Sequence, residues 1–218
     1  MTESQSPLSP MKSGLLWLWN PFTKTAGVSA LIAGIIVILI SAAIAIPSKT
    51  HFDGVLDTHL GSGTPVWFFF AEGIVNWLSL ALVLWIAGLI LCRKDDRKFR
   101  AIDLFGTQAL ARWPFLIISL VCLIPGVSRA TTALANMTIS PEGIPTLPEI
   151  AVGDTLAFAF ASFAMLFATV WFVAISWKAF RISCDASGWR AISAFMVSLI
   201  LAEIISKIVI TKGLVGLI

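Results

Sequence analysis

Five long apolar runs, separated by short polar segments, are the feature that most constrains the fold of this chain. A helix needs about 20 predominantly apolar residues to cross a bilayer. Runs of this kind cover residues 26–47, 66–92, 113–137, 155–177 and 191–210. Only 12% of the residues are charged, against about 25% in soluble domains, so a single buried core cannot absorb the apolar residues. The sequence therefore predicts an all-α, polytopic membrane helix bundle with five transmembrane helices.

The distribution of Lys and Arg predicts how the bundle is oriented. Cytoplasmic segments of membrane proteins carry an excess of these residues. One alternating set of segments holds Lys12, Lys24, Arg93, Lys94, Arg97, Lys98, Arg100, Arg112, Lys178, Arg181 and Arg190. The opposite set holds Lys49, Arg129 and Lys212. We therefore expect a cytoplasmic N-terminus and an external C-terminus, most simply in a bacterial cytoplasmic (inner) membrane.

These boundaries divide the chain into three parts. Residues 1–25 form a cytoplasmic N-terminal segment with an interfacial stretch, residues 26–212 form the five-helix transmembrane domain, and residues 213–218 form a short external tail. A cleaved signal peptide is the alternative for the first run. Because a signal peptide has an apolar region of only about 7–15 residues, we expect this longer run to remain as a membrane helix.

Two pairs of polar residues lie inside predicted spans. Glu72 and Asn76 are four residues apart in the second span, and Glu203 and Lys207 have the same spacing in the fifth. An ionisable side chain within a membrane is a functional candidate by default, so the four residues could form a proton or ion path. The other interpretation, which we favour, is that Glu203 and Lys207 neutralise each other and Glu72 bonds to a neighbouring helix.

The loop after the first span, SKTHFDGVLDTHLGSG, contains His51, Asp53, Asp57 and His59. His and Asp can ligate zinc or manganese, but the spacing matches no metal motif, and we expect a solvated polar loop. No motif of a hydrolase, metalloprotease or nucleotide-binding site occurs in the sequence. The sequence therefore predicts no catalytic residue, no metal ligand and no cofactor. The net charge of +3 is too small and dispersed to indicate nucleic-acid binding.

Small residues recur at helical spacing in three of the spans, which predicts close helix contacts. The fifth span has Ala194, Ser198, Ala202 and Ser206, and the first has Ala26, Ala30 and Gly34. In the fourth, hydroxyl residues recur every seven positions at Thr155, Ser162, Thr169 and Ser176. We interpret all three stripes as contact faces, with a polar pore lining as the alternative for the hydroxyl stripe.

The segment 93–112 carries the densest charge in the chain. Its net positive balance would hold it near anionic headgroups, and its apolar residues around Phe105 indicate a short interfacial helix before the third span. The candidate contacts with lipid or a partner are Arg97, Arg100, Asp103, Leu104, Phe105 and Gly106.

Two short motifs resemble those of the Ypt-interacting-protein (Yip) family of five-span membrane proteins. Asn20-Pro21-Phe22 precedes the first span, and Asp103-Leu104-Phe105-Gly106 is similar to the family's Asp-Leu-Tyr-Gly signature, with Phe in place of Tyr. The resemblance implies a cytoplasmic N-terminus, five spans and an external C-terminus. In eukaryotes this family is associated with small-GTPase binding and vesicle traffic, whereas the short N-terminal segment here resembles a compact bacterial member, to which that role is not carried over.

These observations lead to two expectations about function. The first is a membrane interaction or organising protein of the Yip-like type, without catalytic activity. It would engage membrane lipids, or a cytoplasmic or membrane protein partner, through the 93–112 segment, and it could also self-associate. The alternative is a small membrane transporter or ion pathway that uses the four intramembrane polar residues, Glu72, Asn76, Glu203 and Lys207.

Overall fold

The computed structural model describes residues 18–23, 25–61, 64–91, 99–136, 138–139, 145–146 and 149–215. Its helices are α2 (Gly27–Ser48), α3 (Val66–Leu91), α4 (Ala101–Ala111), α5 (Pro114–Val121), α6 (Pro125–Ala135), α7 (Val152–Cys184) and α8 (Trp189–Ile208), and α8 continues as a π-helical segment, Val209–Leu214. A short 3₁₀ helix, Pro21–Thr23, precedes α2. Two small antiparallel ladders complete the fold: β1 (Thr50–His51) pairs with β2 (His59–Leu60), and β3 (Thr138–Ile139) pairs with β4 (Pro145–Thr146).

Five helical segments are long and apolar enough to cross a membrane, which supports a multi-pass membrane protein. They are Gly27–Ser48, Val66–Leu91, Ala101–Val121, Val152–Cys184 and Trp189–Leu214. Four of them overlap closely with the spans expected from the sequence. The third differs. It comprises α4 and α5 and covers Ala101–Val121, so it starts and ends more than ten residues before the expected span, 113–137.

The third span starts earlier than expected because tertiary contacts satisfy its polar residues. Gln108, which lowers the hydropathy of this segment, donates from Nε2 to the carbonyl of Ser176 at 3.0 Å and accepts from the Ser176 hydroxyl at 2.6 Å. The span is 72% buried inside the protein, whereas the other four are 22–39% buried. A helix surrounded by other helices does not need the apolar outer face that lipid requires.

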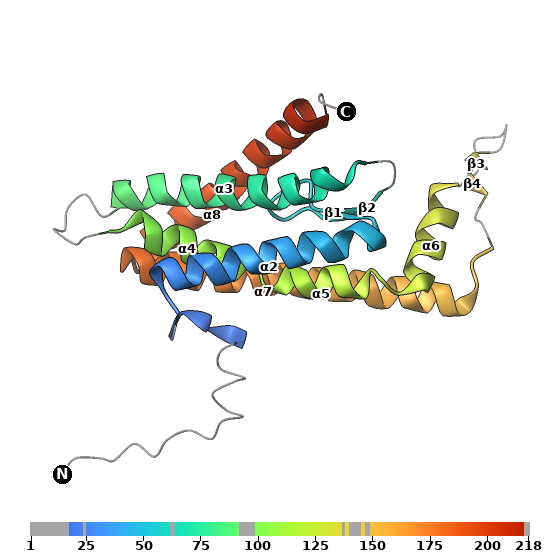
Figure 1. Ribbon diagram of the computed structural model, residues 1–218, viewed down its shortest axis with the longest axis horizontal. Coiled ribbons are helices and arrows are strands. Elements are labelled where there is room, and N and C mark those ends of the chain that lie inside the picture. The colour runs from blue at the N-terminus through green and yellow to red at the C-terminus, as the bar shows by residue number, and fades with distance from the viewer. Residues whose placement is uncertain are drawn as a thin grey trace, which may run out of the picture.

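Pro125 ends the third span at its other boundary. A proline cannot donate a backbone hydrogen bond and is suited to the first turn of a helix, so the chain turns at Ile124 and starts the separate helix α6. Figure 1 shows α6 standing across the direction of α5 and α7. Arg129 of α6 forms a bidentate ion pair with Asp154 of α7, at 2.7 and 2.9 Å, which fixes this short helix at the start of α7.

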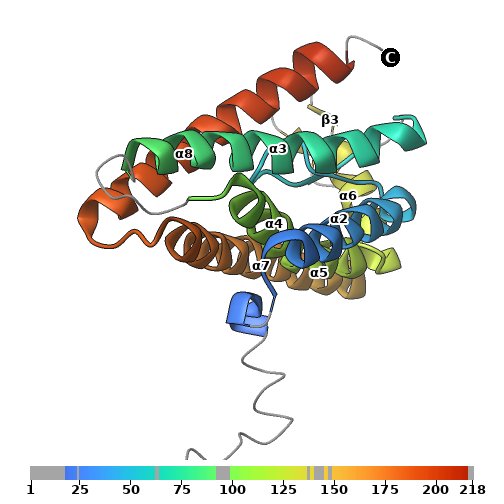
Figure 2. The same ribbon diagram turned by 60° about the vertical axis from the view of Figure 1, so that its left-hand side comes forward.

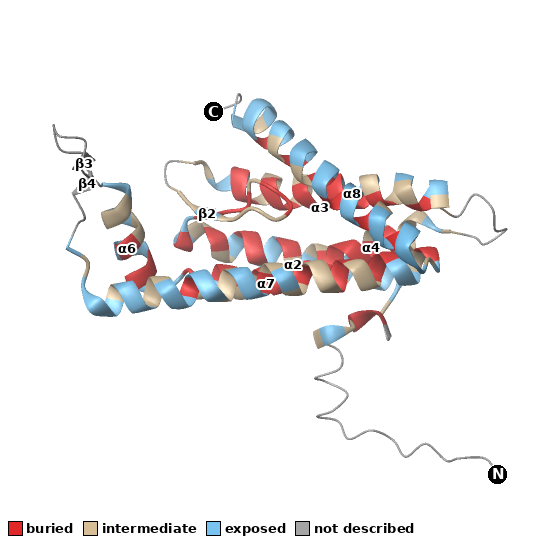
Figure 3. Cartoon of the chain, turned by 180° about the vertical axis from the view of Figure 1, so that it is seen from behind, coloured by how far each residue is buried: buried red, intermediate tan, exposed pale blue. Residues whose placement is uncertain are grey.

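The helices form a bundle with α4 at its centre. Figure 2 shows α3 and α8 on one side of α4, and α2, α5 and α7 on the other. At one end lie the start of α2, the end of α3, the start of α4 and the turn from α7 to α8 (Figure 1). We call it the basic end, because Arg100 precedes α4, Lys178 and Arg181 lie in the last turns of α7, and Arg190 is at the start of α8. At the other, which we call the loop end, residues 49–65 connect α2 to α3 (Figure 1). Figure 3 shows that the outward faces of α7 and α8 are largely exposed, as lipid-facing surfaces would be.

Helices α2 and α4 approach each other through glycine. A Cβ atom at Gly34 of α2 would overlap Ala109 and the backbone of Leu110, and one at Gly106 of α4 would overlap the carbonyl of Gly27. Without a hydrophobic driving force between helices in lipid, such close backbone contact is a main source of association. Gly34 and Gly106 thus hold the central helix against α2.

The three stripes of small residues differ in their roles. Ala30 and Gly34 of α2 are buried, as are Ser198, Ala202 and Ser206 of α8, so most of these two contact faces agrees with the expectation. Ala26, which is exposed, and Ala194, which is half-buried, do not belong to them. The hydroxyl stripe of α7 was wrongly expected to be one contact face. Thr155 and Ser162 are exposed, and together with Thr169 they bond back to carbonyls of their own helix, while Ser176 alone of the four is buried.

The glycine contact predicts that Gly34→Ala destabilises the protein by about 1–3 kcal/mol, because the added methyl group forces α2 and α4 apart. Gly153→Ala is the matched control, since a Cβ there meets nothing within 4 Å, and it should be neutral or slightly stabilising. Thermal unfolding of both variants in detergent micelles measures the difference. Equal unfolding midpoints for the two variants would contradict the packing argument.

Candidate functional site

Residues 49–61 fold back into the bundle as a hairpin, which we call the re-entrant loop. Lys49, in the left-handed conformation at φ 53°, ends α2. The ladder between β1 and β2 then closes the hairpin, which runs between α2 and α3 toward the middle of the bundle (Figure 1). Thr50, His51, Phe52 and Val55 are each at most 5% exposed, so the sequence-based expectation of a solvated loop was wrong for this part. It holds for Asp57 and His59, whose side chains are 44% and 50% exposed.

The polar residues of α3 hold the first half of the re-entrant loop. Glu72 accepts the backbone N–H of Phe52 at 3.3 Å, and its carboxylate lies 3.0 Å from Nδ1 of His51. Asn76 donates from Nδ2 to the carbonyl of Phe52. Glu72 and Asn76 are at most 1% exposed, so one face of α3 supplies both an acceptor and a donor to an inserted stretch of backbone.

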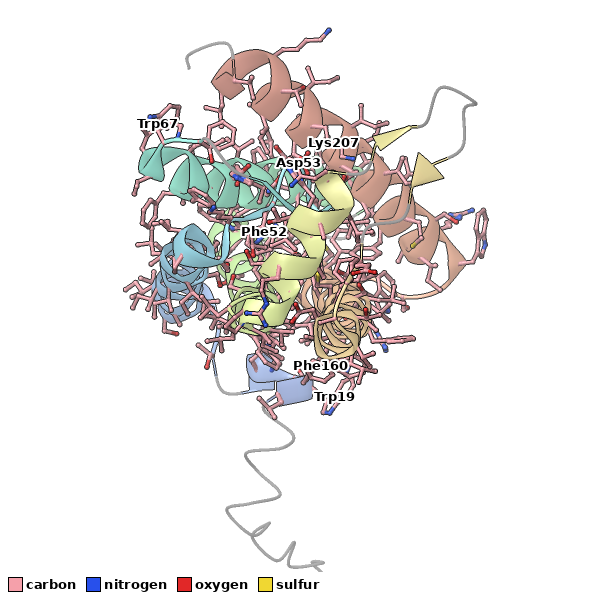
Figure 4. All side chains as sticks on the ribbon, turned by 90° about the vertical axis from the view of Figure 1, so that its right-hand side faces the viewer. Trp19, Phe52, Asp53, Trp67, Phe160 and Lys207 are labelled. Atoms are coloured by element: carbon pink, nitrogen blue, oxygen red, sulfur yellow. The ribbon has the colours of Figure 1, made fainter. Side chains whose placement is uncertain are left out.

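The polar residues of α8 hold the second half. Glu203 accepts the backbone N–H of Leu56 at 2.8 Å, and a Cβ on Gly54 would overlap the same carboxylate. Lys207 lies 3.5 Å from Glu203 but only 2.6 Å from Asp57 of the loop. Figure 4, seen from the loop end, places Phe52 in the middle of the bundle and Lys207 beside the loop, near Asp53. The expected pair between Glu203 and Lys207 is present, and the loop residue Asp57 is its third member.

The Lys207 ammonium group also acts on the ionisation of Asp57. Its hydrogen bond is the main cause that lowers the pKa of the Asp57 carboxyl below 3.8, while partial burial opposes the shift. Asp57 is therefore ionised at neutral pH, and its charge balances that of Lys207. The sequence did not identify Asp57 as a partner of Lys207, because the two residues are 150 positions apart.

The loop residues that could ligate a metal each have another partner, although the rings of His51 and His59 stack at 5.4 Å. His51 binds Glu72, His59 lies 3.3 Å from Asp53, and Asp57 binds Lys207. Over the residues that the structure describes, no group of three or more His, Cys, Asp or Glu side chains is arranged to hold a metal ion.

An open pocket of about 210 Å³ lies beside the loop. His51 and Glu72 lie at its wall with Asp53, His59 and Thr64, and Ile210 closes one side. The His51 ring connects two of these groups, because Nδ1 faces Glu72 and Nε2 faces the Thr64 hydroxyl at 3.0 Å. The pocket thus brings titratable groups of α3 and of the loop to the loop end of the bundle.

The expected contact motif at residues 103–106 lies within the third span instead of before it. Leu104 is fully buried, Gly106 packs on α2, and the Phe105 ring contacts Trp77 and Trp85 edge-on while its carbonyl accepts from the Trp77 indole. Asp103 is part-exposed. In this structure the motif packs helices against each other. The expected location was wrong because hydropathy alone placed the start of the third span too late.

Of the two basic residues expected to accompany that motif, the structure describes only Arg100. Arg100 is exposed, with Nε 3.6 Å from Asp103, so it remains at the surface of the basic end. Arg97 lies outside the described residues.

A hollow of about 570 Å³ opens at the basic end between the N-terminal segment and the α7–α8 turn. Lys178 and Arg181 of α7 line it, together with Asn20 and Asp185. Lys178 donates to the carbonyl of Trp19 at 3.1 Å, and the Trp19 ring stacks on Trp171 at 4.7 Å. The sequence analysis did not find this site, because its walls come from opposite ends of the chain.

Arg112 is the other residue whose place was misjudged. The charge pattern put it at the cytoplasmic surface, but it lies between α4 and α5 and is 4% exposed. The signal that could have found it is its position between the buried Gln108 and Pro114 of one span.

No family model, no curated protein and no solved structure matched this chain.

The anchoring of the loop predicts that Glu72→Leu destabilises the protein by about 1–3 kcal/mol for each buried donor left without an acceptor. Glu72→Gln keeps one acceptor oxygen and should lose less. Unfolding in detergent measures stability, and thiol labelling of Val55→Cys, introduced at a fully buried position, measures release of the loop. Glu149→Leu removes an exposed carboxylate at the same end and is the control. Slow labelling of Val55→Cys in the Glu72→Leu background would show that Glu72 does not hold the loop.

Proposed function

We propose that this protein is a multi-pass protein of a bacterial cytoplasmic membrane that binds and organises membrane components without catalysing a reaction. In this proposal the N-terminus is cytoplasmic, the C-terminus is external, and the basic end faces the cytoplasm. The supporting charge pattern does not need Arg112, because the sequence still has ten other Lys and Arg residues in the segments of that side. The opposite side has Lys49, Arg129 and Lys212, together with Lys207 beside the loop.

The observation that carries the proposal is the hollow at the basic end. Lys178 and Arg181 present positive charge there, at the level where Trp19 and Trp189 are 45% and 73% exposed. Tryptophan is enriched at the headgroup level of membranes, and each basic residue near an anionic leaflet contributes about 1 kcal/mol of attraction. A concave surface with Lys178 and Arg181 beside such aromatic residues suits the phosphate of an anionic lipid, because these two positive charges exceed the one carboxylate of the wall, Asp185.

The proposed contact surface differs in part from the one expected from the sequence. Residues 101–111 of the 93–112 segment form α4, and Leu104 and Gly106 are buried, so they are not available to a partner in this conformation. Arg100 remains exposed at the same end as Lys178 and Arg181. We assign the binding of lipid to these three residues.

We further propose that the chain is Yip-like. The two motif segments support this, because the 3₁₀ helix Pro21–Thr23 contacts α4, and Phe22 and Leu104 belong to one hydrophobic cluster. Phe22 and Leu104, 82 positions apart in the sequence, thus belong to one packed unit at the basic end, so the two motif segments contact each other.

The lipid site predicts that Lys178→Gln and Arg181→Gln each weaken the binding of phosphatidylglycerol about fivefold, which corresponds to about 1 kcal/mol for one charge near the surface. Native mass spectrometry of the delipidated protein with added lipid measures the bound fraction. Lys212→Gln, an exposed basic residue at the other end, is the control and should leave binding unchanged. An equal loss in all three variants would argue against a site at this hollow.

A second candidate function is a proton pathway, and the pocket at the loop end favours it. The buried pair of Glu72 and His51 lines this pocket, so a carboxylate and an imidazole within the bundle are in reach of the external solution. Such groups mark proton relays in membrane proteins.

If the pathway exists, proteoliposomes should show proton flux that falls at least tenfold in Glu72→Gln, while Glu203→Gln retains it, because Glu203 lies outside that pocket. A pH-sensitive dye inside the vesicles measures the flux. Wild-type vesicles that leak no faster than protein-free vesicles would exclude this candidate.

A further inference from the structure

Arg112 carries a charge near the middle of the most buried span. It stands at the junction of α4 and α5, eleven residues after the start of the span at Ala101, which is about 16 Å of helical rise. Its side chain is 4% exposed. The guanidinium group is therefore removed from both membrane surfaces and from lipid.

The neighbours of Arg112 are aromatic. Its guanidinium lies 4.6 Å from the centre of the Phe115 ring and 5.4 Å from that of Phe172. Ring faces attract a cation, but they offer no lone pair to its N–H groups. Within the part of the chain that the structure describes, Nη1 of Arg112 is buried without a hydrogen-bond partner.

No carboxylate compensates this charge at close range among the described residues. The acidic group whose charge acts on Arg112 is Glu203. That carboxylate accepts the N–H of Leu56 and lies 3.5 Å from Lys207, whose closer partner at 2.6 Å is Asp57. Glu203 is therefore the longer-range counter-charge of Arg112. At that range Glu203 supplies no acceptor to the guanidinium, and a buried charged donor without an acceptor is strongly unfavourable, so an accepting group is required beside Arg112.

A small cavity lies beside the guanidinium. Its volume is about 10 Å³, which admits one sphere the size of a water molecule. Arg112 and Ser41 are the polar side chains of its wall, and Ile38, Phe52, Phe69 and Phe115 supply most of the rest. The Ser41 hydroxyl is also buried and has no hydrogen-bond partner over the described ranges.

The chemistry of this cavity is that of an anion site. The guanidinium can only donate hydrogen bonds, the Ser41 hydroxyl can donate one, and the wall contains no carboxylate. A neutral water molecule would accept these bonds but would leave Arg112 without a counter-charge in direct contact. An anion would accept them and balance the charge.

We propose that this cavity binds a single monatomic anion, chloride under physiological conditions, between Arg112 and Ser41. The re-entrant loop covers the site, because Phe52 lies in its wall and its ring meets Phe115 edge-on at 5.3 Å. Chloride is larger than water, so binding requires a small outward shift of the Phe52 or Phe69 ring. Polyatomic anions such as sulfate do not fit the cavity.

The site predicts that chloride stabilises the purified protein in a saturable manner. Thermal unfolding is followed in detergent while sodium chloride replaces sodium gluconate at constant ionic strength. A ligand that binds the folded state alone raises stability with its concentration according to its dissociation constant. Sodium sulfate should give no saturable rise, because its general stabilisation by exclusion from the protein surface grows steadily with concentration.

Three variants locate the effect. Ser41→Ala removes one hydrogen bond to a charged group and should raise the dissociation constant for chloride about tenfold. Arg112→Met should abolish the chloride dependence. Lys212→Gln, which removes an exposed charge far from the cavity, should leave it unchanged.

A direct measurement covers the case in which Arg112→Met does not fold. Line broadening of the chloride NMR signal by the wild-type protein should disappear in Ser41→Ala or require about tenfold more chloride. The proposal is overturned if wild-type stability and line width do not depend on chloride, in which case the cavity holds only water. A chloride effect that is the same in wild type and Ser41→Ala would also overturn it.

Discussion

The insertion of polypeptide backbone between helices is the constraint on which the rest of this structure depends. Inside a membrane, each backbone N–H and C=O group must find a partner within the protein. The re-entrant loop meets this requirement through side chains, because Glu72 and Glu203 accept the N–H groups of Phe52 and Leu56 while Asn76 donates to the carbonyl of Phe52. Polar residues that would be unfavourable in lipid are therefore necessary beside the loop.

The same loop connects the two halves of the molecule. It bonds to α3 through Glu72 and to α8 through Glu203 and Lys207, while Phe52 reaches the rings around Arg112. Helix α8 makes most of its helix contacts with α3 and few with α7. The loop thus ties α8 to the bundle with polar bonds as well as packing, and it closes the cavity beside Arg112 from the loop end.

The third span, Ala101–Val121, was misplaced by hydropathy alone, whereas the other four spans were close to their expected positions. Residues 101–112 contain Asp103, Gln108 and Arg112, and for that reason the segment was expected to lie at the membrane surface as a short interfacial helix. Ser176 satisfies Gln108, and the rings of Phe115 and Phe172 surround Arg112. Those partners lie on other helices or beyond a kink, so no local pattern around residues 101–112 reveals them.

Part of the candidate site was open to prediction and part was not. The spacing of Glu72 with Asn76, and of Glu203 with Lys207, marked the right faces of two helices and favoured a structural role for them. Their partners in the loop could not be identified, because a backbone N–H such as that of Leu56 looks the same at every position in a sequence. The hollow at the basic end is lined by both Asn20 and Arg181. These residues are far apart in the sequence, and they come close only because of how α7 packs.

The sequence by itself determined the helical, multi-pass character of this protein, the approximate bounds of four spans and the end at which basic residues collect. These properties follow from the composition of local segments, since the length of an apolar run sets whether a helix can cross a bilayer. Tertiary structure alone decided that the loop enters the bundle, that α4 occupies its centre and that Arg112 is buried. Each of these depends on contacts between distant residues, whose hydrogen bonds and close packing offset the unfavourable burial of polar groups.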